Sequence, residues 1–414
     1  MKKVFLISLI TVCLNSVYGQ IMWQFNKDTV LSWSYEWGDE FNGDKLDKEK
    51  WSTGAGGAHT IFWQKEQQYY TDDENNIVEK DGTLRITTKK ENFEGRADDA
   101  MADKDSLIVN KKFIGFNKHT FKYTSGKINA NRLFDKGFFE IRFKAPAEKG
   151  MWPAFWLYGG FPDEEIDIFE LKGERHSQIH VETHCPNECD YVKTWYGKRM
   201  SWGGWVSVNG DLAGSFNVVA GEWNGNFVKM YINGKCIGYS PVKFNIPKSL
   251  QANTAVPSDD GPFTPGPSKD FTQSSPFEID YIRVWTKDTV ANAPQVRKVA
   301  KRVKIPFKNT SAGKVKSKRV GKFLYGKKEN HQNEGIFVSL FPEEGTDKRY
   351  VLYLSGLKPA EEVTISVKGE AGQKLFETKC HDFMNNLDLS KIPGGNFKLS
   401  ISYKDKVAET RIDL

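Results

Sequence analysis

Apolar and polar side chains alternate along most of the chain, in short runs that turn residues interrupt. Residues 228–235 (VKMYINGK) show the pattern, because an alternating run leads into Asn233-Gly234, a dipeptide that favours the tight turn of a β-hairpin. Similar runs occur at 126–132, 363–367 and 397–403. A period of two places successive side chains on opposite faces of a strand. Little of the chain has the period of a helix, so the pattern predicts an all-β sandwich or barrel.

One alternating run, residues 165–170 (EIDIFE), places carboxylates between large apolar side chains. In a regular strand Glu165 and Asp167 share one face, but Glu170, three residues after Asp167, points to the other face. A β-bulge at or next to Phe169 would return Glu170 to the acidic face, and bulges are frequent beside active sites. We therefore predict a bulged strand that holds three carboxylates in one cleft.

Three clustered carboxylates suit glycoside hydrolysis, in which one carboxyl group is the general acid and another is the nucleophile or base. We assign Glu165 and Glu170 to this pair. Asp167 would repel negative charge, help to keep a neighbour protonated, and hold the nucleophile through a shared hydrogen bond. A strand with a solvated acidic edge is the alternative, and it would be preferred for an isolated pair of acids.

The residues before this strand argue against a solvated edge. Residues 150–157 (GMWPAFWL) form a strand-like run that is rich in tryptophan. Aromatic rings fill protein cores and also stack on sugar rings. Trp152 and Trp156 are therefore candidate substrate-binding residues, with core packing as the alternative role.

These two motifs, with further blocks in the same order, resemble glycoside hydrolase family 16, the laminarinase, agarase and carrageenase type. The other matching blocks are 37–43 (WGDEFNG), 66–71 (EQQYYT), 81–86 (DGTLRI), 124–126 (TSG), 137–142 (GFFEIR), 183–184 (TH) and 280–285 (DYIRVW). The resemblance spans about residues 33–286. Ordered blocks over this length are a far more specific signal than the six-residue motif.

The resemblance implies a concanavalin-like β-jelly-roll sandwich with an open cleft, and an enzyme that hydrolyses internal bonds of a β-linked polysaccharide by double displacement with retention. By position, it makes Glu165 the nucleophile, Asp167 its helper and Glu170 the acid/base. It also places His184 close to the carboxylates, where a structural histidine is the alternative.

The resemblance implies no required cofactor. Asp280 stands where the family has a calcium-ligand aspartate on the convex side, and an ordinary strand-end aspartate is an equal alternative. A calcium ion there would be structural.

Departures from the family pattern fall around the expected subsites. Gln64 and Lys65 replace paired asparagines, Glu164 replaces a glycine before the nucleophile, and residues 257–267 (PSDDGPFTPGP) replace a Gly-Gly-Trp loop. The first expected substrate is β-1,3-glucan of the laminarin kind. A β-galactan such as agar, porphyran, carrageenan or a keratan-like chain is the alternative.

Two further functions compete with an endo-β-glycanase: a glycan-binding protein that has lost catalysis, and a transglycosylase that passes the glycosyl-enzyme to another sugar. The presence of all three acids argues against the first of these. Hydrolase and transglycosylase share a covalent intermediate, so only a product assay separates them.

The N-terminus has the layout of a secretory signal peptide over residues 1–19: a basic start at Lys2-Lys3, an apolar run, and a small-residue exit. Cys13 follows the large Val12, which argues against lipoprotein processing. No later apolar run is long enough to span a membrane. We therefore expect a secreted protein, extracellular, periplasmic or at the cell surface.

At 414 residues the chain is long enough for two domains. We expect the catalytic jelly roll at 20–288, a basic linker at 289–334, and a small C-terminal β-sandwich at 335–414 that serves as an accessory or sorting module. The alternating runs 363–367 and 397–403 support this last unit. It faintly resembles the C-terminal sorting tails of secreted Bacteroidetes proteins, but its ending (RIDL) lacks their basic finish.

The expected linker holds 13 Lys or Arg and no Asp or Glu between residues 289 and 328. A solvated arm is the simpler interpretation, and docking to an anionic surface or sulfated glycan is the alternative. An exported protein is not expected to bind nucleic acid. Its expected partner is the polysaccharide substrate, which it would bind as a monomer.

The close cysteines Cys185 and Cys189 flank a three-residue loop. A local disulfide is one possibility. A zinc site with His184 is the other, but no second cysteine pair follows to complete it.

Overall fold

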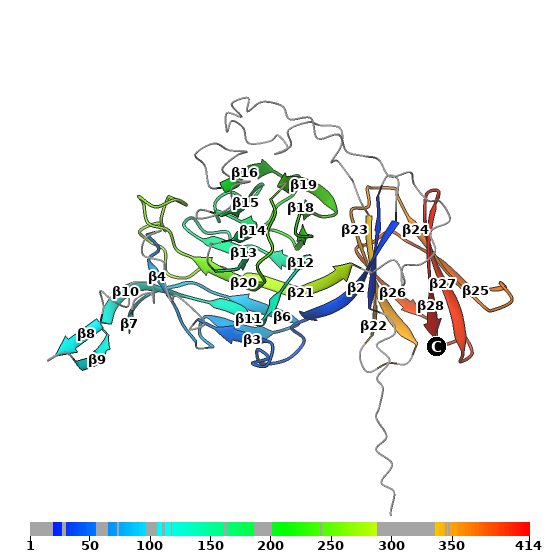
Figure 1. Ribbon diagram of the computed structural model, residues 1–414, viewed down its shortest axis with the longest axis horizontal. Helices are drawn as coiled ribbons and strands as arrows, with labels where there is room; N and C mark the ends of the chain where they lie inside the picture. The colour runs from blue at the N-terminus through cyan, green and yellow to red at the C-terminus, as the bar shows by residue number, and fades with distance from the viewer. Residues whose placement is uncertain are drawn as a thin grey trace, which may run out of the picture.

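The computed structural model describes residues 20–26, 30–54, 65–72, 74–96, 106–109, 112–116, 118–160, 164–185, 201–240, 242–287, 336–343, 346 and 348–414. Within these ranges every regular element is a β-strand (Figure 1). The all-β prediction is confirmed. The same ranges contain no helix that is long and apolar enough to span a membrane.

One sheet of the larger sandwich has seven strands and includes the predicted catalytic strand β14. Its order is β16 (Ser201–Ser207), β15 (Gln178–His184), β14 (Glu165–Glu170), β13 (Trp152–Tyr158), β20 (Lys248–Ala255), β11 (Lys127–Phe134) and β3 (Trp51–Thr53). Because β14 pairs with a neighbour on each side, two independent registers fix which of its side chains face the core.

The opposite sheet begins with six strands in the order β19 (Lys235–Ser240), β18 (Val228–Ile232), β17 (Asn217–Trp223), β12 (Gly137–Lys144), β21 (Phe277–Lys287) and β2 (Val30–Asp39). Strand β6 (Thr83–Ile86) pairs with β21 and with β5 (Ile77–Lys80). Asn233 and Gly234 connect β18 to β19 with φ angles of 46° and 76°. Positive φ at both positions is what a type I′ hairpin turn requires, so this turn prediction is confirmed.

A continuous apolar core fills the space between the two sheets. Strand β14 contributes Ile166, Ile168 and Phe169, each of which is 0% exposed. The ring of Phe169 stacks on Phe143 of β12 in the opposite sheet at a centroid distance of 4.4 Å. The catalytic strand is therefore anchored through its apolar face, which leaves its acidic face on the outer side of the seven-stranded sheet.

Two small sheets complete the described N-terminal part. One contains β4 (Gln68–Tyr70), β10 (Lys118–Ser125) and β7 (Lys89–Arg96), and the other pairs β8 (Ser106–Val109) with β9 (Lys112–Phe116). The β8–β9 hairpin projects from one end of the molecule (Figure 1).

A second, smaller sandwich lies at the other end (Figure 1). One of its sheets has the order β25 (Lys374–Cys380), β24 (Val363–Lys368), β27 (Asn396–Tyr403) and β28 (Lys406–Asp413). The other layer comprises β1 (Ile21–Phe25), β22 (Ile336–Pro342), β23 (Arg349–Ser355) and β26 (Met384–Asp388). These four strands continue the large sheet, because β1 pairs with β2 on one side and with β22 on the other.

The N-terminal strand therefore packs with the C-terminal part of the chain, although it lies within the range expected for the catalytic unit. Trp23 and Phe25 belong to the core of the smaller sandwich. No local signal in residues 20–26 identifies the strands that pair with β1. The basic stretch and the signal-peptide residues lie outside the described residues.

Candidate active site

The registers on both sides of β14 show the predicted bulge. Against β13, Asp167 lies opposite Trp156 and Phe169 lies opposite Phe155, so Ile168 is the extra residue. Against β15, the register shifts between Asp167 and Glu170. The prediction of a bulge at or next to Phe169 is confirmed. It places Glu165, Asp167 and Glu170 on the same outer face, opposite the core.

Glu165 and Asp167 form a hydrogen-bonded carboxyl pair. Asp167 is 3% exposed, whereas Glu165 is partly exposed. Burial raises the pKa of Asp167 well above its usual value, and the negative charges of Glu170 and Glu182 add to this. Burial and the charge of Asp167 likewise raise the pKa of Glu165. The pair therefore retains a proton to a higher pH than two separate carboxyl groups would.

Glu170 is held through both carboxyl oxygens. Its Oε1 accepts a hydrogen bond of 2.9 Å from Nε1 of Trp152, and its Oε2 lies 3.0 Å from Nδ1 of His180. Its residue exposure is 9%. This carboxyl group is therefore fixed in orientation at the surface of the sheet.

His184, the histidine singled out in the sequence, lies beside the carboxyl pair. Its Nε2 is 3.1 Å from Oδ2 of Asp167. The structure thus brings His184 together with the acids of β14, and its partly exposed ring also leaves it accessible from the outer face.

The two tryptophans of β13 have different surroundings. The ring of Trp152 is 6% exposed and is stacked against Phe263, with 4.1 Å between centroids and 3° between ring planes. Phe263 lies in the loop 257–267 that departs from the family pattern. Trp156 is partly exposed, and its Nε1 donates to Oδ1 of Asn253 at 2.7 Å. Trp156 can therefore present a ring face to a sugar, whereas one face of Trp152 is covered.

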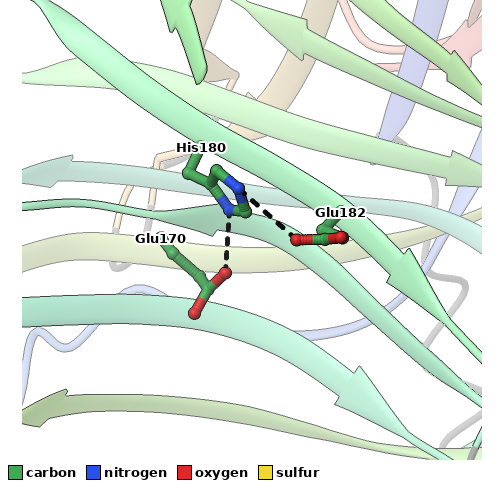
Figure 2. Close-up of side chains that lie close together, drawn as sticks. All are labelled: Glu170, His180 and Glu182. Atoms are coloured by element: carbon green, nitrogen blue, oxygen red, sulfur yellow. Dashed lines mark hydrogen bonds and ion pairs between the residues drawn. The ribbon is translucent and has the colours of Figure 1, made fainter. Parts of the chain in front are cut away.

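Two residues of the site were missed in the sequence. His180 and Glu182 precede His184 by four and two residues on β15, so all three side chains point to the same face as the acids of β14. Nε2 of His180 lies 3.4 Å from Oε2 of Glu182, and Figure 2 shows the imidazole between Glu182 and Glu170. The two-residue spacing of His180, Glu182 and His184 was a signal in the sequence. The bulge in β14, however, decides which acid of β14 each of these residues faces.

The unexpected Glu164 has a structural role. Its carboxylate forms a buried ion pair with Lys248 and also accepts a hydrogen bond of 3.2 Å from the backbone N–H of Ile246. Glu164 is 5% exposed and Lys248 is 0% exposed. Burial lowers the pKa of Lys248, while Glu164 opposes this effect. The pair ties the beginning of β14 to the beginning of β20.

The surroundings of Asp280 do not fit a calcium site. Its Oδ2 accepts a hydrogen bond of 2.6 Å from Nη1 of Arg142. The Arg142 guanidinium in turn lies 4.6 Å from the ring centroids of Phe216 and Phe383. A guanidinium cation already neutralises Asp280, and a calcium site needs several oxygen ligands rather than a neighbouring cation.

Cys185 is disulfide-bonded, so its sulfur is not a zinc ligand. Cys189, the predicted partner, lies outside the described residues. The thiols of Cys236 and Cys380 are buried and reduced.

Comparisons with known proteins agree with this geometry. The family model for glycosyl hydrolases family 16 matches residues 60–248. The glucan endo-1,3-beta-glucosidase A1 of Niallia circulans is 29% identical over 280 residues, which is 60% of this chain but 37% of that protein. The glucan endo-1,3-beta-glucosidase of Cryptopygus antarcticus is 25% identical over 284 residues, covering 62% of this chain and 93% of that protein.

The fold has a counterpart among solved structures. The catalytic domain of an endo-1,3-beta-glucanase (laminarinase) from Thermotoga petrophila RKU-1 matches with a TM-score of 0.50 and 24% identity, over 63% of this chain and 100% of that domain. This likeness shows that the larger sandwich has the jelly-roll fold. Together with the family match over residues 60–248 and the bulged acidic strand, it shows that the larger sandwich resembles the catalytic domains of glycoside hydrolase family 16.

Proposed function

We propose that this protein is a secreted β-glucan hydrolase that cleaves internal bonds of β-1,3-glucan with retention at the anomeric carbon. The observation that carries the proposal is the bulged strand β14, which presents Glu165, Asp167 and Glu170 together on the outer face of the sheet. The two curated relatives described above, both named as glucan endo-1,3-beta-glucosidases, support the choice of substrate.

In the first step the carboxylate of Glu165 bonds to the anomeric carbon while the bond from this carbon to the glycosidic oxygen breaks. Glu170 gives its proton to that oxygen, so the leaving sugar departs as an alcohol. In the second step Glu170 takes a proton from water, whose oxygen displaces Glu165 and completes the hydrolysis. Two displacements at one carbon restore its original configuration.

Asp167 serves the nucleophile through their shared hydrogen bond. A nucleophile must be ionised, so in the competent form the shared proton lies on the more deeply buried Asp167, which donates it toward the carboxylate of Glu165. Ionised Glu165 is partly exposed and is therefore the member of the pair that a sugar can reach.

A sulfated or carboxylated β-galactan is the second candidate substrate. Two cations lie near the covered Trp152: the Lys172 ammonium is 5.8 Å and the Arg175 guanidinium 5.2 Å from the ring of Trp205. Phe263, stacked on Trp152, is 5.7 Å from Trp205. An anionic substituent on the sugar would find these cations beside an aromatic wall.

A panel of polysaccharides tests the substrate. Laminarin, mixed-linkage β-glucan, agarose, κ-carrageenan and keratan sulfate are each incubated with the wild type and with Glu165→Gln, and new reducing ends are counted. We expect reducing ends from laminarin with the wild type alone. Release from a galactan but not from laminarin would favour the second candidate. Products longer than the starting oligosaccharide would indicate transglycosylation.

A further inference from the structure

Each ring nitrogen of His180 faces a different carboxylate. Its Nδ1 faces Oε2 of Glu170 at 3.0 Å and its Nε2 faces Oε2 of Glu182 at 3.4 Å, as Figure 2 shows. The side chains of His180 and Glu170 are each 12% exposed. The imidazole is thus enclosed and has an acceptor at each nitrogen.

The ligand atoms of Glu170, His180 and Glu182 lie within 4.8 Å of one another, a spacing that also allows a metal ion. The two carboxylates face opposite nitrogens of one ring. An imidazole binds a given ion through one nitrogen only, so an ion held there would replace one of the two carboxylate contacts of His180. A hydrogen-bond chain uses all three groups.

Aromatic rings hold the imidazole in place. Its centroid is 5.1 Å from the ring of Trp205 on β16 and 5.6 Å from that of Phe263, which it meets at 90°. These apolar neighbours keep water from the ring, and an enclosed hydrogen bond to a charged group is stronger than one in water. The ring is therefore fixed beside Glu170.

We propose that His180 is a positioning residue for the acid/base Glu170 and that Glu182 holds the other nitrogen of its imidazole. This inference rests on the proposed function, because it gives His180 its role through Glu170. An imidazolium has an N–H on each nitrogen, so it donates to both carboxylates at once. A neutral imidazole satisfies only one of them.

The charged groups in contact with His180 are carboxylates. Glu170 faces it from β14, and Glu182 faces it along β15. His184, also on β15, lies 3.9 Å from the same Oε2 of Glu182. Two cations, Lys172 and Arg175, lie against Trp205, the ring that also packs on His180. The two carboxylates are the groups in direct contact and outweigh the more distant cations.

The consequence for catalysis follows from the contacts of Glu170. Trp152 and the imidazolium both donate to it, so the proton that Glu170 delivers to the substrate sits on a lone pair that faces neither group. When this proton leaves, the carboxylate that forms already has two donors in place. His180 thereby stabilises the carboxylate that remains on Glu170 after the proton has left.

Two isosteric substitutions test this role. In His180→Asn the amide nitrogen occupies the place of Nδ1 and can donate to Glu170. In His180→Gln the amide nitrogen reaches the place of Nε2, beside Glu182, and the hydrogen bond to Glu170 is lost. Both variants are neutral at every pH and similar in size, so each serves as the matched control for the other.

The readouts are the pH profile of kcat/KM on laminarin and the rate on a dinitrophenyl β-laminaribioside, whose leaving group needs no proton. For His180→Gln we expect kcat on laminarin to fall by about 10- to 100-fold. The basic limb of the kcat/KM profile of this variant should move to higher pH by on the order of one unit, because Glu170 loses a donor to its carboxylate. Glycosylation by the dinitrophenyl substrate should stay close to wild type.

For His180→Asn we expect a loss on laminarin of less than about 10-fold, since a neutral donor remains. Glu182→Gln should move the basic limb in the same direction as His180→Gln but by less, because the imidazolium loses one of its two carboxylates. Thermal unfolding of each variant checks that the sheet has formed.

Equal losses on both substrates with an unmoved pH profile would overturn the proposal, because they would show a purely structural role. Equal losses in His180→Asn and His180→Gln would also overturn it. If the wild type releases no reducing ends from laminarin, the proposed substrate fails instead. The same comparison of variants is then made on whichever polysaccharide of the panel is cleaved.

Discussion

The guanidinium of Arg283 donates to both carboxylate oxygens of Glu40, at 2.8 and 2.7 Å, from a position that is 0% exposed. Its flat faces lie 4.0 Å from the ring centroid of Phe341 and 4.2 Å from that of Tyr353, both in the smaller sandwich. The ion pair therefore sits where the two sandwiches meet. Glu40 neutralises the charge of Arg283, and aromatic rings pack against the faces of its guanidinium.

Replacing Arg283 by Lys should destabilise the protein by about 3 kcal/mol, because an ammonium loses the paired hydrogen bonds and the stacking while Glu40 keeps its charge. Urea unfolding measures this difference. Arg132→Lys is the matched control: Arg132 forms a 2.6 Å ion pair with Glu36, but its side chain is 42% exposed. An exposed pair should change stability by less than about 1 kcal/mol. Similar values for the two variants would contradict the assigned role of Arg283.

The second prediction concerns removal of the C-terminal sandwich. A stop after residue 288 takes away β22, the partner of β1, and uncovers the apolar cluster in which Phe337 and Phe341 pack against Trp285 and Phe138. Loss of two buried aromatic side chains alone corresponds to about 3–6 kcal/mol. We expect the truncated protein to unfold at a lower temperature and to self-associate. A truncated monomer with an unchanged Tm would contradict this.

The third prediction concerns the catalytic carboxylates. Glu165→Gln and Glu170→Ala should each lower kcat on unactivated polysaccharide by more than about 1,000-fold, because each group acts in the transition state. Substrate binding, measured by calorimetry, should change little. Glu370→Gln, at an exposed turn of the smaller sandwich, is the control and should keep full activity. Activity above a few per cent in either catalytic variant would refute the mechanism.

The fourth prediction concerns pH and Asp167. A carboxyl group whose pKa is raised in the folded state binds more protons folded than unfolded, so stability falls as pH rises from the unfolded pKa, about 4, toward the folded value. Asp167→Asn removes this penalty and should raise the free energy of unfolding at pH 8 more than at pH 4. Urea titrations at both values measure it.

The same substitution should move the acid limb of kcat/KM to lower pH. With the aspartate charge gone, Glu165 loses the repulsion that raises its pKa, and it ionises at a lower pH. The asparagine side chain still donates toward Glu165. An acid limb that stays in place would show that a group other than the carboxyl pair sets it.

Much of the fold and of the acidic strand was predictable because both depend on local alternation. Alternation of apolar and polar residues identified strands. Asp167 and Glu170 are three residues apart, so a bulge was needed if the acids were to act together on one face. The contacts of Trp152 were not predictable, because Phe263 comes from a loop about a hundred residues later whose path no local pattern gives.

Positions that depend on register or on distant partners account for the other differences. His180 and Glu182 stand at strand spacing from His184, but only the register across the bulge assigns His180 to Glu170. The sequence also does not reveal that the guanidinium of Arg142 donates to Oδ2 of Asp280. The pairing of β1 with β22 joins residues about three hundred positions apart.

The last prediction concerns the basic stretch between residues 289 and 328, with its 13 Lys or Arg and no Asp or Glu. Truncation cannot test it, because a stop after residue 288 also removes β22 and its contacts. Replacing the 13 positive residues by Ser and Gln leaves both sandwiches intact.

If the stretch only connects them, hydrolysis of neutral laminarin and binding of a sulfated galactan should both equal the wild type at every salt concentration. If it binds an anionic glycan, the wild type should bind the sulfated galactan more tightly at 0.01 M salt. This advantage should largely disappear at physiological strength, where the Debye length shrinks from about 30 to about 8 Å. We expect the linker outcome. A salt-sensitive advantage confined to the sulfated glycan would reverse this expectation and place that glycan ahead of laminarin as the substrate.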